Sequence, residues 1–246
     1  LHVTSDGFLV CRHDNTLERT TNVASVFPNR YSRDRTDGDT EVHWYIKDFT
    51  LEELKKLDAG SWFDQKFAGS RILTFAEAVK IVRGKAGIYP ELKDPELYSA
   101  EGFNIISLFM EELKKLGLEN PDQDPSTPVI IQCFSADALK ILKKSGCRHP
   151  KTFLVGQTGK KWLDLKEMKK ISSFAEGIGP DKTLLYEDPS IVSRARGMGL
   201  TVTPYTFRKL SFPEQFSSVT EEMRHMLYTL EVDALFTDNP DLFPRE

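Results

Sequence analysis

Apolar and polar positions alternate along this chain in a repeating way. Short apolar runs of strand length are separated by stretches in which apolar residues recur at helical spacing. Because helical patterns separate most of these runs, the sequence predicts parallel strands joined by helical crossovers. Seven runs are predicted as strands, and they cover residues 8–11, 87–93, 128–134, 151–156, 176–180, 200–206 and 233–237.

Helix-start signals support this alternation. Capping boxes, in which Ser or Thr is followed three residues later by Glu, begin at Thr50 and Thr74. Ser135 is placed to cap the helix after the run 128–134, and Pro189 stands where the first position of another helix is expected. Apolar spacing predicts further helices around residues 103–117, 165–171 and 220–230.

One long segment interrupts the alternation. Residues 22–71 are polar and rich in Arg and Asp, and within them only the stretch after Thr50 has helical spacing, with Leu51, Leu54 and Leu57. We therefore expect an excursion from the alternation, at about residues 23–70, that carries one short helix within a single domain spanning residues 1–246.

Two α/β architectures fit this order, a closed barrel and an open doubly wound sheet. No glycine-rich phosphate-binding fingerprint follows any predicted strand, which disfavours a nucleotide-binding sheet. Polar residues instead follow nearly every strand, and in a barrel the carboxyl ends of the strands converge on one catalytic face. The pattern therefore favours a TIM-type (β/α)8 barrel.

Composition narrows the function classes. The chain has 246 residues, of which 39% are hydrophobic and 28% charged, as in an ordinary globular domain, and no apolar run has the length of a membrane helix. A net charge of −4 without a long basic block argues against nucleic acid as the main partner. Cys11, Cys133 and Cys147 match no metal-binding spacing or disulfide framework, so we expect buried free thiols.

The candidate chemistry lies at the ends of the predicted strands. The strand ends offer an imidazole, an ammonium group, several carboxylates and two aromatic rings. Together these groups suit a hard divalent cation, an anionic substrate and a group that transfers protons. The residues concerned are His13 and Asp14, Glu91 and Lys93, Gln132 and Phe134, Asp181, Tyr205 and Asp238.

Structural explanations remain open for the two strongest candidates. An imidazole such as that of His13 can give or take a proton near neutral pH, but a histidine at a strand end also serves as a structural hydrogen-bonding group. Glu91 and Lys93 could form a surface ion pair at a strand edge. Their spacing of two residues places both on one strand face, and a charged pair inside a barrel is costly unless it binds something.

At these residues the chain resembles the glycerophosphodiester phosphodiesterase family, most closely its secreted or periplasmic branch. The similar blocks run through the whole chain in the order that the family shows. They are Thr4-Ser-Asp-Gly7, Val10-Cys-Arg-His-Asp14, Leu17-Glu-Arg-Thr-Thr-Asn22, Gly87-Ile-Tyr-Pro-Glu-Leu-Lys93, Ile131-Gln-Cys-Phe134, Gly177-Ile-Gly-Pro180, Thr203-Pro-Tyr-Thr206 and Leu235-Phe-Thr-Asp-Asn-Pro-Asp241.

The resemblance implies hydrolysis of glycerophosphodiesters to glycerol 3-phosphate and an alcohol, in glycerophospholipid breakdown, with Ca²⁺ or Mg²⁺ as cofactor. It implies that His13 is catalytic, that Glu91 is a metal ligand and that Lys93 lies near the phosphate. Phe134 and Tyr205 match positions where the family lines its pocket with aromatic side chains, and Gln132, at the end of a predicted strand, is also expected to contact substrate. Residues 23–70 match the place of the family's small insertion over the active-site face. The small molecule is the expected partner, and the oligomeric state is not indicated.

One departure from the family pattern stands out. The family's His-Arg-Gly and Glu-any-Asp motifs, which supply a second catalytic histidine and two metal ligands, should stand immediately before Leu1 and are absent from this sequence. His2 is not expected to replace them. Their absence matches the count of seven strands, because a closed barrel of this type needs eight, so the first strand–helix unit is expected to be missing here.

Two alternatives remain open, and the first of them rests on that departure. The chain could be a catalytically impaired barrel that acts as a binding protein, and poor Ca²⁺ or Mg²⁺ affinity would then be expected, since such sites need several oxygen ligands. It could also be a phospholipase D-type barrel that cleaves lysophospholipids. A disulfide-bearing loop is expected of that type, and no cysteine pair is placed for one.

Overall fold

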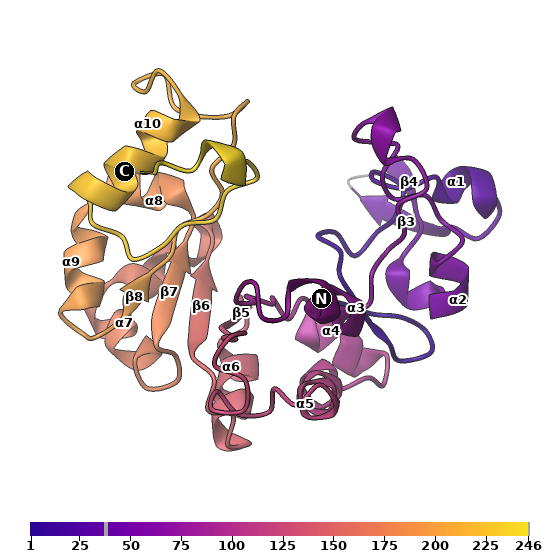
Figure 1. Ribbon diagram of the computed structural model, residues 1–246, viewed down its shortest axis with the longest axis horizontal. Helices are drawn as coiled ribbons and strands as arrows, with labels where there is room; N and C mark the ends of the chain where they lie inside the picture. Colours follow the sequence, from indigo (N-terminus) through magenta and orange to yellow (C-terminus); the bar gives the residue numbers. More distant parts are fainter. Residues whose placement is uncertain (37–38, 246) are drawn as a thin grey trace. The chain divides into compact units, whose positions relative to one another are not determined.

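The computed structural model describes residues 1–36 and 39–245, so Asp37 and Gly38 of the predicted insertion lie outside the described residues, as does Glu246. The chain divides into two compact units, Leu1–Val129 and Ile130–Glu246 (Figure 1). None of the described helices is long and apolar enough to cross a membrane.

The first unit is mainly helical and carries two small antiparallel ladders. Strand β1 (His2–Val3) pairs with β2 (Leu9–Val10), and β3 (Ser32–Thr36) pairs with β4 (Asp39–His43). Its helices are α1 (Val23–Val26), η1 (Ile46–Asp48), α2 (Leu51–Leu54), η2 (Gln65–Phe67), α3 (Phe75–Val82), α4 (Pro95–Ala100) and α5 (Ile105–Lys115).

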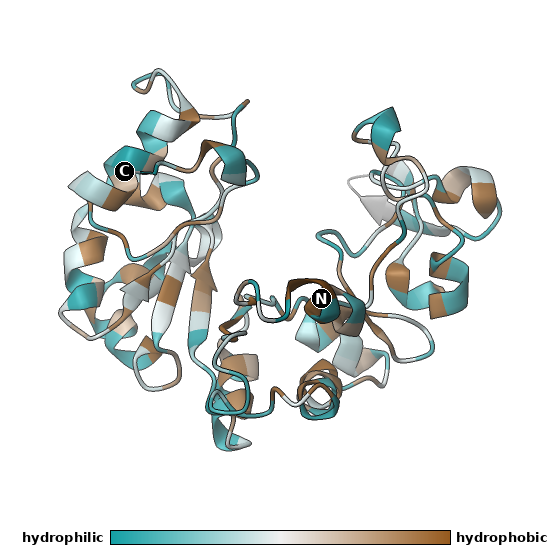
Figure 2. Cartoon of the chain, viewed as in Figure 1, coloured by the Kyte–Doolittle hydropathy of each residue, from teal (hydrophilic) through white to brown (hydrophobic). Residues whose placement is uncertain are grey.

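Local sequence signals place these helices well. The capping boxes predicted at Thr50 and Thr74 are both formed, each with reciprocal bonds to the Glu three residues later, and they begin α2 and α3. Figure 2 shows both hydrophobic and hydrophilic residues on α5, as expected of an amphipathic helix, and its buried residues include Ile105, Phe109 and Leu113.

Two expectations about strands in this unit need correction. The run 8–11 was expected to lie parallel to the other strands, but β2 is antiparallel to β1, because a tight turn with Gly7 at φ +83° returns the chain directly. The run 87–93, expected as a continuous strand, makes isolated bridges instead, and one of them is the parallel bridge between Ile88 and Val129.

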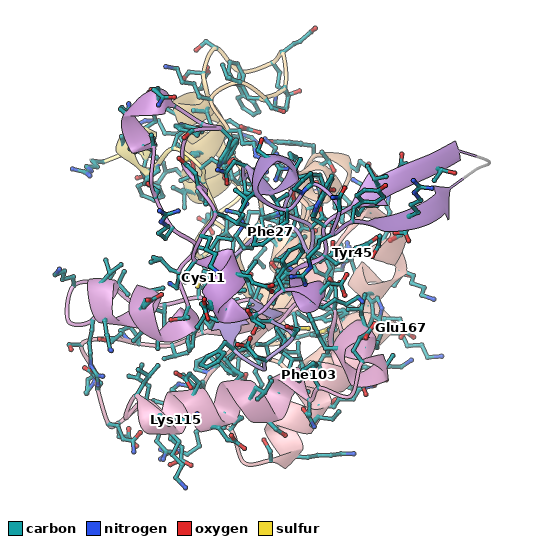
Figure 3. All side chains as sticks on the ribbon, turned by 90° about the vertical axis from the view of Figure 1, so that its right-hand side faces the viewer. Cys11, Phe27, Tyr45, Phe103, Lys115 and Glu167 are labelled. Atoms are coloured by element: carbon teal, nitrogen blue, oxygen red, sulfur yellow. The ribbon has the colours of Figure 1, made fainter. Side chains whose placement is uncertain are left out.

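The segment predicted as an insertion holds more structure than the one helix expected. The hairpin β3–β4 was missed because its sequence is polar and lacks a clear apolar alternation. The segment has an apolar core built with β2, and Trp44 Nε1 donates to the carbonyl oxygen of Phe27 at 2.8 Å. Figure 3 labels Phe27 and Tyr45 in this region. The buried core residues are Val10, Leu17, Val23, Trp44, Ile46, Phe49, Leu54, Leu57 and Ile72.

The second unit is built on a parallel sheet, as the alternation predicted. Its strands, among the described residues, follow the order β5 (Ile131–Cys133), β6 (Lys151–Val155), β7 (Gly177–Pro180) and β8 (Thr201–Val202). The run 233–237 contributes the parallel bridge between Phe207 and Thr237. The helices are α6 (Ala136–Lys144), η3 (Gln157–Leu163), α7 (Leu165–Ile171), α8 (Lys182–Glu187), α9 (Ser190–Arg196), α10 (Val219–Arg224), η4 (His225–Thr229) and η5 (Pro240–Leu242).

The two faces of this sheet differ in chemistry. One row of paired residues, Cys133, Phe153, Ile178 and Val202, is apolar, and Phe153 packs against Phe174 just beyond α7 with ring centroids 5.7 Å apart. The neighbouring row on the other face holds Gln132, Thr152, Gly177 and Thr201. At Gly177 an added Cβ would lie 2.3 Å from Thr201 Oγ1, so close packing on this face requires glycine.

All three cysteines are free, as the sequence predicted. Cys133 and Cys147 are buried, whereas Cys11 is only partly buried.

Candidate functional site

His13 follows β2 and presents an exposed imidazole whose orientation is fixed by its neighbours. Its Nδ1 lies 2.7 Å from Asp14 Oδ1, and Arg19 Nε donates to Asp14 Oδ2 at 2.6 Å. The Arg19 hydrogen bond is the main reason that the pKa of Asp14 falls to about 2. Asp14 therefore stays ionised and favours a proton on Nδ1 of His13, which leaves Nε2 for proton transfer.

His2 on β1 ties this segment to the protein core. Its Nδ1 lies 2.9 Å from the hydroxyl of Tyr98, and its Nε2 lies 3.3 Å from the carbonyl oxygen of His13. Burial is the main cause that lowers the pKa of His2 to about 3, and the nearby charge of Lys93 contributes. His2 thus remains neutral and holds the main chain of His13 in place.

Glu91 and Lys93 lie beside the same β1 segment. The main-chain nitrogen of Leu1 donates to the carbonyl oxygen of Glu91, and the nitrogen of Lys93 donates to the carbonyl oxygen of Leu1 at 3.3 Å. Lys93 Nζ lies 3.1 Å from Glu91 Oε2, with 17% and 18% of the two side chains exposed. The two side chains therefore lie on one side, as their spacing predicted, and form a largely buried ion pair.

In the first unit the main chains of His13, Glu91 and Lys93 thus each contact residue 1 or residue 2. An imidazole, a carboxylate and an ammonium group are side chains of the kinds that bind anions and transfer protons. Within the parts of the chain that the structure describes, no three His, Cys, Asp or Glu side chains form a group that could hold a metal ion. Glu91 is one possible oxygen ligand, and by itself it does not make a Ca²⁺ or Mg²⁺ site.

The second unit collects the other predicted residues at the carboxyl end of its sheet. Gln132 lies on β5 in the polar row, and Phe134, two residues later, is on the same face. Phe134 and Tyr205 form an edge-to-face pair with ring centroids 6.0 Å apart. Both rings lie next to Gly156, which directly follows β6. A Cβ added at Gly156 would lie 3.7 Å from the Tyr205 hydroxyl and 3.8 Å from Phe134 Cε1.

Asp181 and Asp238, the other strand-end carboxylates, have local roles in the structure. Asp181 accepts from the main-chain nitrogen and the hydroxyl of Thr183 and caps α8. Asp238 Oδ2 accepts from Arg208 Nε at 2.7 Å. Sequence reasoning missed Arg19 as the partner of Asp14. The only signal was an opposite charge five residues away, which is not a regular spacing of any secondary structure.

Comparison with known proteins gives a consistent result. The model of the glycerophosphoryl diester phosphodiesterase family matches residues 1–242. A glycerophosphodiester phosphodiesterase of Arabidopsis thaliana is 31% identical, and the match covers 95% of this chain and 73% of that protein. One of Haemophilus influenzae is 27% identical over 98% of this chain and 78% of that protein. A putative glycerophosphodiester phosphodiesterase of Bacillus subtilis is 38% identical, and the match covers 100% of this chain and 83% of that protein.

Solved structures agree on the fold. A phosphodiesterase of Oleispira antarctica, solved in complex with its product sn-glycerol-3-phosphate, matches with a TM-score of 0.70 at 24% identity, covering 97% of this chain and 78% of that one. A glycerophosphodiester phosphodiesterase from Agrobacterium tumefaciens matches with a TM-score of 0.63 at 22% identity, over 98% and 83%. These neighbours are TIM-type barrels, and they confirm the predicted fold class.

Proposed function

Because the chain belongs to the glycerophosphoryl diester phosphodiesterase family, we propose that it hydrolyses glycerophosphodiesters to glycerol 3-phosphate and an alcohol. The observation that carries this proposal is that the main chains of His13, Glu91 and Lys93 all contact the first two residues of the chain, with Glu91 and Lys93 paired. Such products belong to the breakdown of glycerophospholipids, which we propose as the setting of the reaction.

Each side chain has a role that its surroundings support. Lys93 carries a positive charge in a largely buried position and would bind a phosphate oxygen of the diester. Either water attacks phosphorus directly, or the neighbouring glycerol hydroxyl attacks and water then opens the cyclic phosphate that results. The attacking oxygen loses a proton, the bond from phosphorus to the leaving oxygen breaks, and the leaving oxygen takes up a proton. His13 Nε2 is the group proposed to accept the first of these protons or to deliver the second, while Asp14 holds Nδ1.

Members of this family generally depend on a divalent cation. We propose Ca²⁺ or Mg²⁺ for this chain, with Glu91 as one ligand, and such an ion would neutralise charge on the phosphate oxygens. The described residues supply no complete ligand set, so the roles given above rest on the side chains of this chain alone. Gln132, Phe134 and Tyr205 are proposed to contact substrate, because Gln132 lies on β5 and the rings of Phe134 and Tyr205 contact each other beyond the strands β5 and β8.

Substitution of the ion pair tests these roles. Glu91→Gln keeps the shape of the side chain and removes its charge, so release of glycerol 3-phosphate should fall and recover in part at high Ca²⁺ or Mg²⁺ concentration. Lys93→Met should lose activity without such recovery, because the lost group meets phosphate rather than metal. Steady-state product assays across a cation titration measure both effects.

A matched control lies on α5, where Lys115 Nζ and Glu112 Oε2 form an ion pair at 3.3 Å with 69% of the lysine side chain exposed. Glu112→Gln and Lys115→Met should leave activity within about twofold, since exposed ion pairs contribute little. Unchanged activity in Glu91→Gln and Lys93→Met would remove both residues from the site. A wild-type chain that cleaves no glycerophosphodiester at any cation concentration would contradict the proposed function itself.

A further inference from the structure

Three aromatic side chains that the proposed reaction does not use are exposed next to one another. Trp62, Phe63 and Phe67 are 50%, 70% and 42% exposed, and we call them the aromatic cluster. The ring centroids of Trp62 and Phe63 lie 5.7 Å apart, and those of Phe63 and Phe67 lie 5.9 Å apart. They belong to the segment between α2 and α3 (Figure 1). Exposing three adjoining large aromatic rings to water is unfavourable, and such patches often mark a surface that binds a ligand, a protein or a membrane.

The segment that carries the aromatic cluster is held by a dense set of hydrogen bonds. The carboxylate of Asp58 accepts from the main-chain nitrogens of Gly60, Ser61 and Gly69 at 2.8 to 2.9 Å, and from the Ser61 hydroxyl at 2.6 Å. These bonds keep the pKa of Asp58 well below its usual range. Trp62 Nε1 also donates to the carbonyl oxygen of Ala59 at 3.0 Å.

This arrangement fixes the aromatic rings before any ligand arrives. At Gly60 an added Cβ would lie 2.0 Å from the carbonyl oxygen of Phe67, so the two ends of the segment pack closely. A preorganised surface loses little conformational entropy when it binds. The aromatic cluster is therefore carried by a segment whose backbone is held in place.

The rings of the aromatic cluster already attract cations of the protein. The Arg19 guanidinium lies 5.9 Å from the centre of the Trp62 ring, and Lys66 Nζ lies 4.9 Å from the centre of the Phe67 ring. Both distances are in the range of cation–π attraction. Phe63, between the two, is the most exposed ring of the three.

The aromatic cluster is also connected to His13 by a short series of contacts. Arg19, which faces Trp62, donates to Asp14, and Asp14 in turn lies 2.7 Å from His13. Arg19 thus contacts both the aromatic cluster and the carboxylate that holds the imidazole to which we assign proton transfer with the leaving oxygen.

We propose that the aromatic cluster binds the cationic end of the leaving alcohol, and that the preferred alcohol carries a quaternary ammonium group, as choline does. This inference rests on the proposed function, because it names the class of substrate for the same reaction. A quaternary ammonium ion is weakly hydrated and fits an aromatic surface. A primary ammonium ion is strongly hydrated and gains less there, and an uncharged alcohol gains no electrostatic attraction.

Kinetics on two substrates test the proposal. Trp62→Ala and Phe63→Ala should each lower kcat/KM for glycerophosphocholine by about 2- to 30-fold, mainly through KM, which is the range that cation–π contacts support. Cleavage of glycerophosphoglycerol should change by less than about twofold. Phe63→Tyr retains an aromatic face and should keep most of the preference for the choline diester.

Ile81→Ala, which shortens an exposed apolar side chain of α3, is the matched control and should alter neither substrate. Equal losses on both diesters in Trp62→Ala and Phe63→Ala would overturn the proposal. A second result would also overturn the proposal. If Trp62→Ala and Phe63→Ala cleave both diesters as the wild-type chain does but no longer bind phosphatidylcholine and phosphatidylglycerol vesicles, the cluster is a membrane contact.

A binding measurement separates this inference from the proposed reaction. Tetramethylammonium chloride should shift the NMR signal of the Trp62 indole N–H in the wild-type chain, whereas methylammonium chloride at the same ionic strength should not. Phe63→Ala should weaken the tetramethylammonium effect. If the chain cleaves no diester but this shift is present, the proposed function fails and the cation surface stands. If cleavage occurs without any shift, the cluster does not bind the leaving group.

Discussion

Two contacts hold His13 in place. Its side chain contacts a charged group, the Asp14 carboxylate, and its main-chain carbonyl oxygen contacts a neutral one, the His2 imidazole. Asp14 contacts the imidazole, and Arg19 keeps Asp14 ionised. His2, buried and neutral, contacts the carbonyl oxygen of His13. The imidazole thus stays exposed while its orientation is fixed, which is what proton transfer requires.

Replacement of His13 tests this role at the scale of the residue. His13→Ala should reduce turnover on a choline diester by roughly two to four orders of magnitude, the usual contribution of general acid or base catalysis. If His13 protonates the leaving oxygen, a diester whose leaving alcohol has a low pKa should lose much less activity, because such an alcohol departs without a proton. Stopped assays on the two diesters give the comparison.

The outcomes of this experiment distinguish the possible roles of His13. Equal losses on both substrates would assign His13 as the base that activates the nucleophile. Unchanged turnover on both would make it a structural histidine and contradict the proposed mechanism. Arg19→Gln serves as a companion variant, since it keeps His13 and removes the guanidinium that lowers the pKa of Asp14.

At the scale of elements, side chains from α8 and α10 hold the chain beyond β8. Lys182 Nζ lies 2.7 Å from Glu222 Oε1 and 3.2 Å from the carbonyl oxygen of Ser211, and the Tyr186 hydroxyl donates to the same Glu222 oxygen at 2.6 Å. Glu222 is completely buried. The main-chain nitrogen of Lys182 also donates to the carbonyl oxygen of Tyr205, so this cluster supports a predicted substrate contact.

Breaking this buried pair should destabilise the fold strongly. Lys182→Met leaves the Glu222 charge buried beside Tyr186, and we expect a loss of about 3 to 5 kcal/mol in the free energy of unfolding. The double variant Lys182→Met with Glu222→Leu should recover much of that loss, because it removes the unpaired charge. Denaturant unfolding curves of the three chains measure the effect.

The exposed pair of Lys140 and Asp137 on α6 is the control, with Nζ and Oδ1 2.8 Å apart. Lys140→Met should change the free energy of unfolding by less than about 1 kcal/mol. A similarly small change in Lys182→Met would show that the buried pair does not support the elements around it.

For the whole molecule, His2 makes stability depend on pH. Unfolded His2 takes up a proton near pH 6.5, its ordinary value, whereas in the folded chain burial lowers its pKa to about 3. Between these values the unfolded state binds more protons, so this histidine lowers the free energy of unfolding as the pH falls below about 6.5. His2→Gln keeps polar atoms near Tyr98 and removes the titration.

Unfolding measured from pH 8 to pH 4 should therefore show a smaller decline in His2→Gln than in the wild-type chain. Carboxylates titrate in both chains, and the comparison cancels their contribution to first approximation. A parallel decline in the two chains would mean that His2 is as easily protonated when folded as when unfolded.

The sequence by itself determined the features that depend on neighbours along the chain. Both capping boxes, the helix over residues 165–171 and the parallel strands β5 to β8 follow from local side-chain chemistry and periodicity. The placement of Glu91 and Lys93 on one side also follows, because a spacing of two residues has that consequence in any extended chain. The α/β barrel class and the family could be predicted because ordered motifs occur from end to end.

Only the tertiary structure decided contacts between residues that are distant in sequence or lack regular spacing. The antiparallel turn of β2 onto β1 was missed because an apolar run gives no strand direction, and the β3–β4 hairpin was missed because its residues are polar. The link from His13 through Asp14 and Arg19 to Trp62 spans loops without periodicity. Hydrogen bonds and ring contacts of this kind depend on where the folded backbone places each side chain, and a linear pattern does not contain that information.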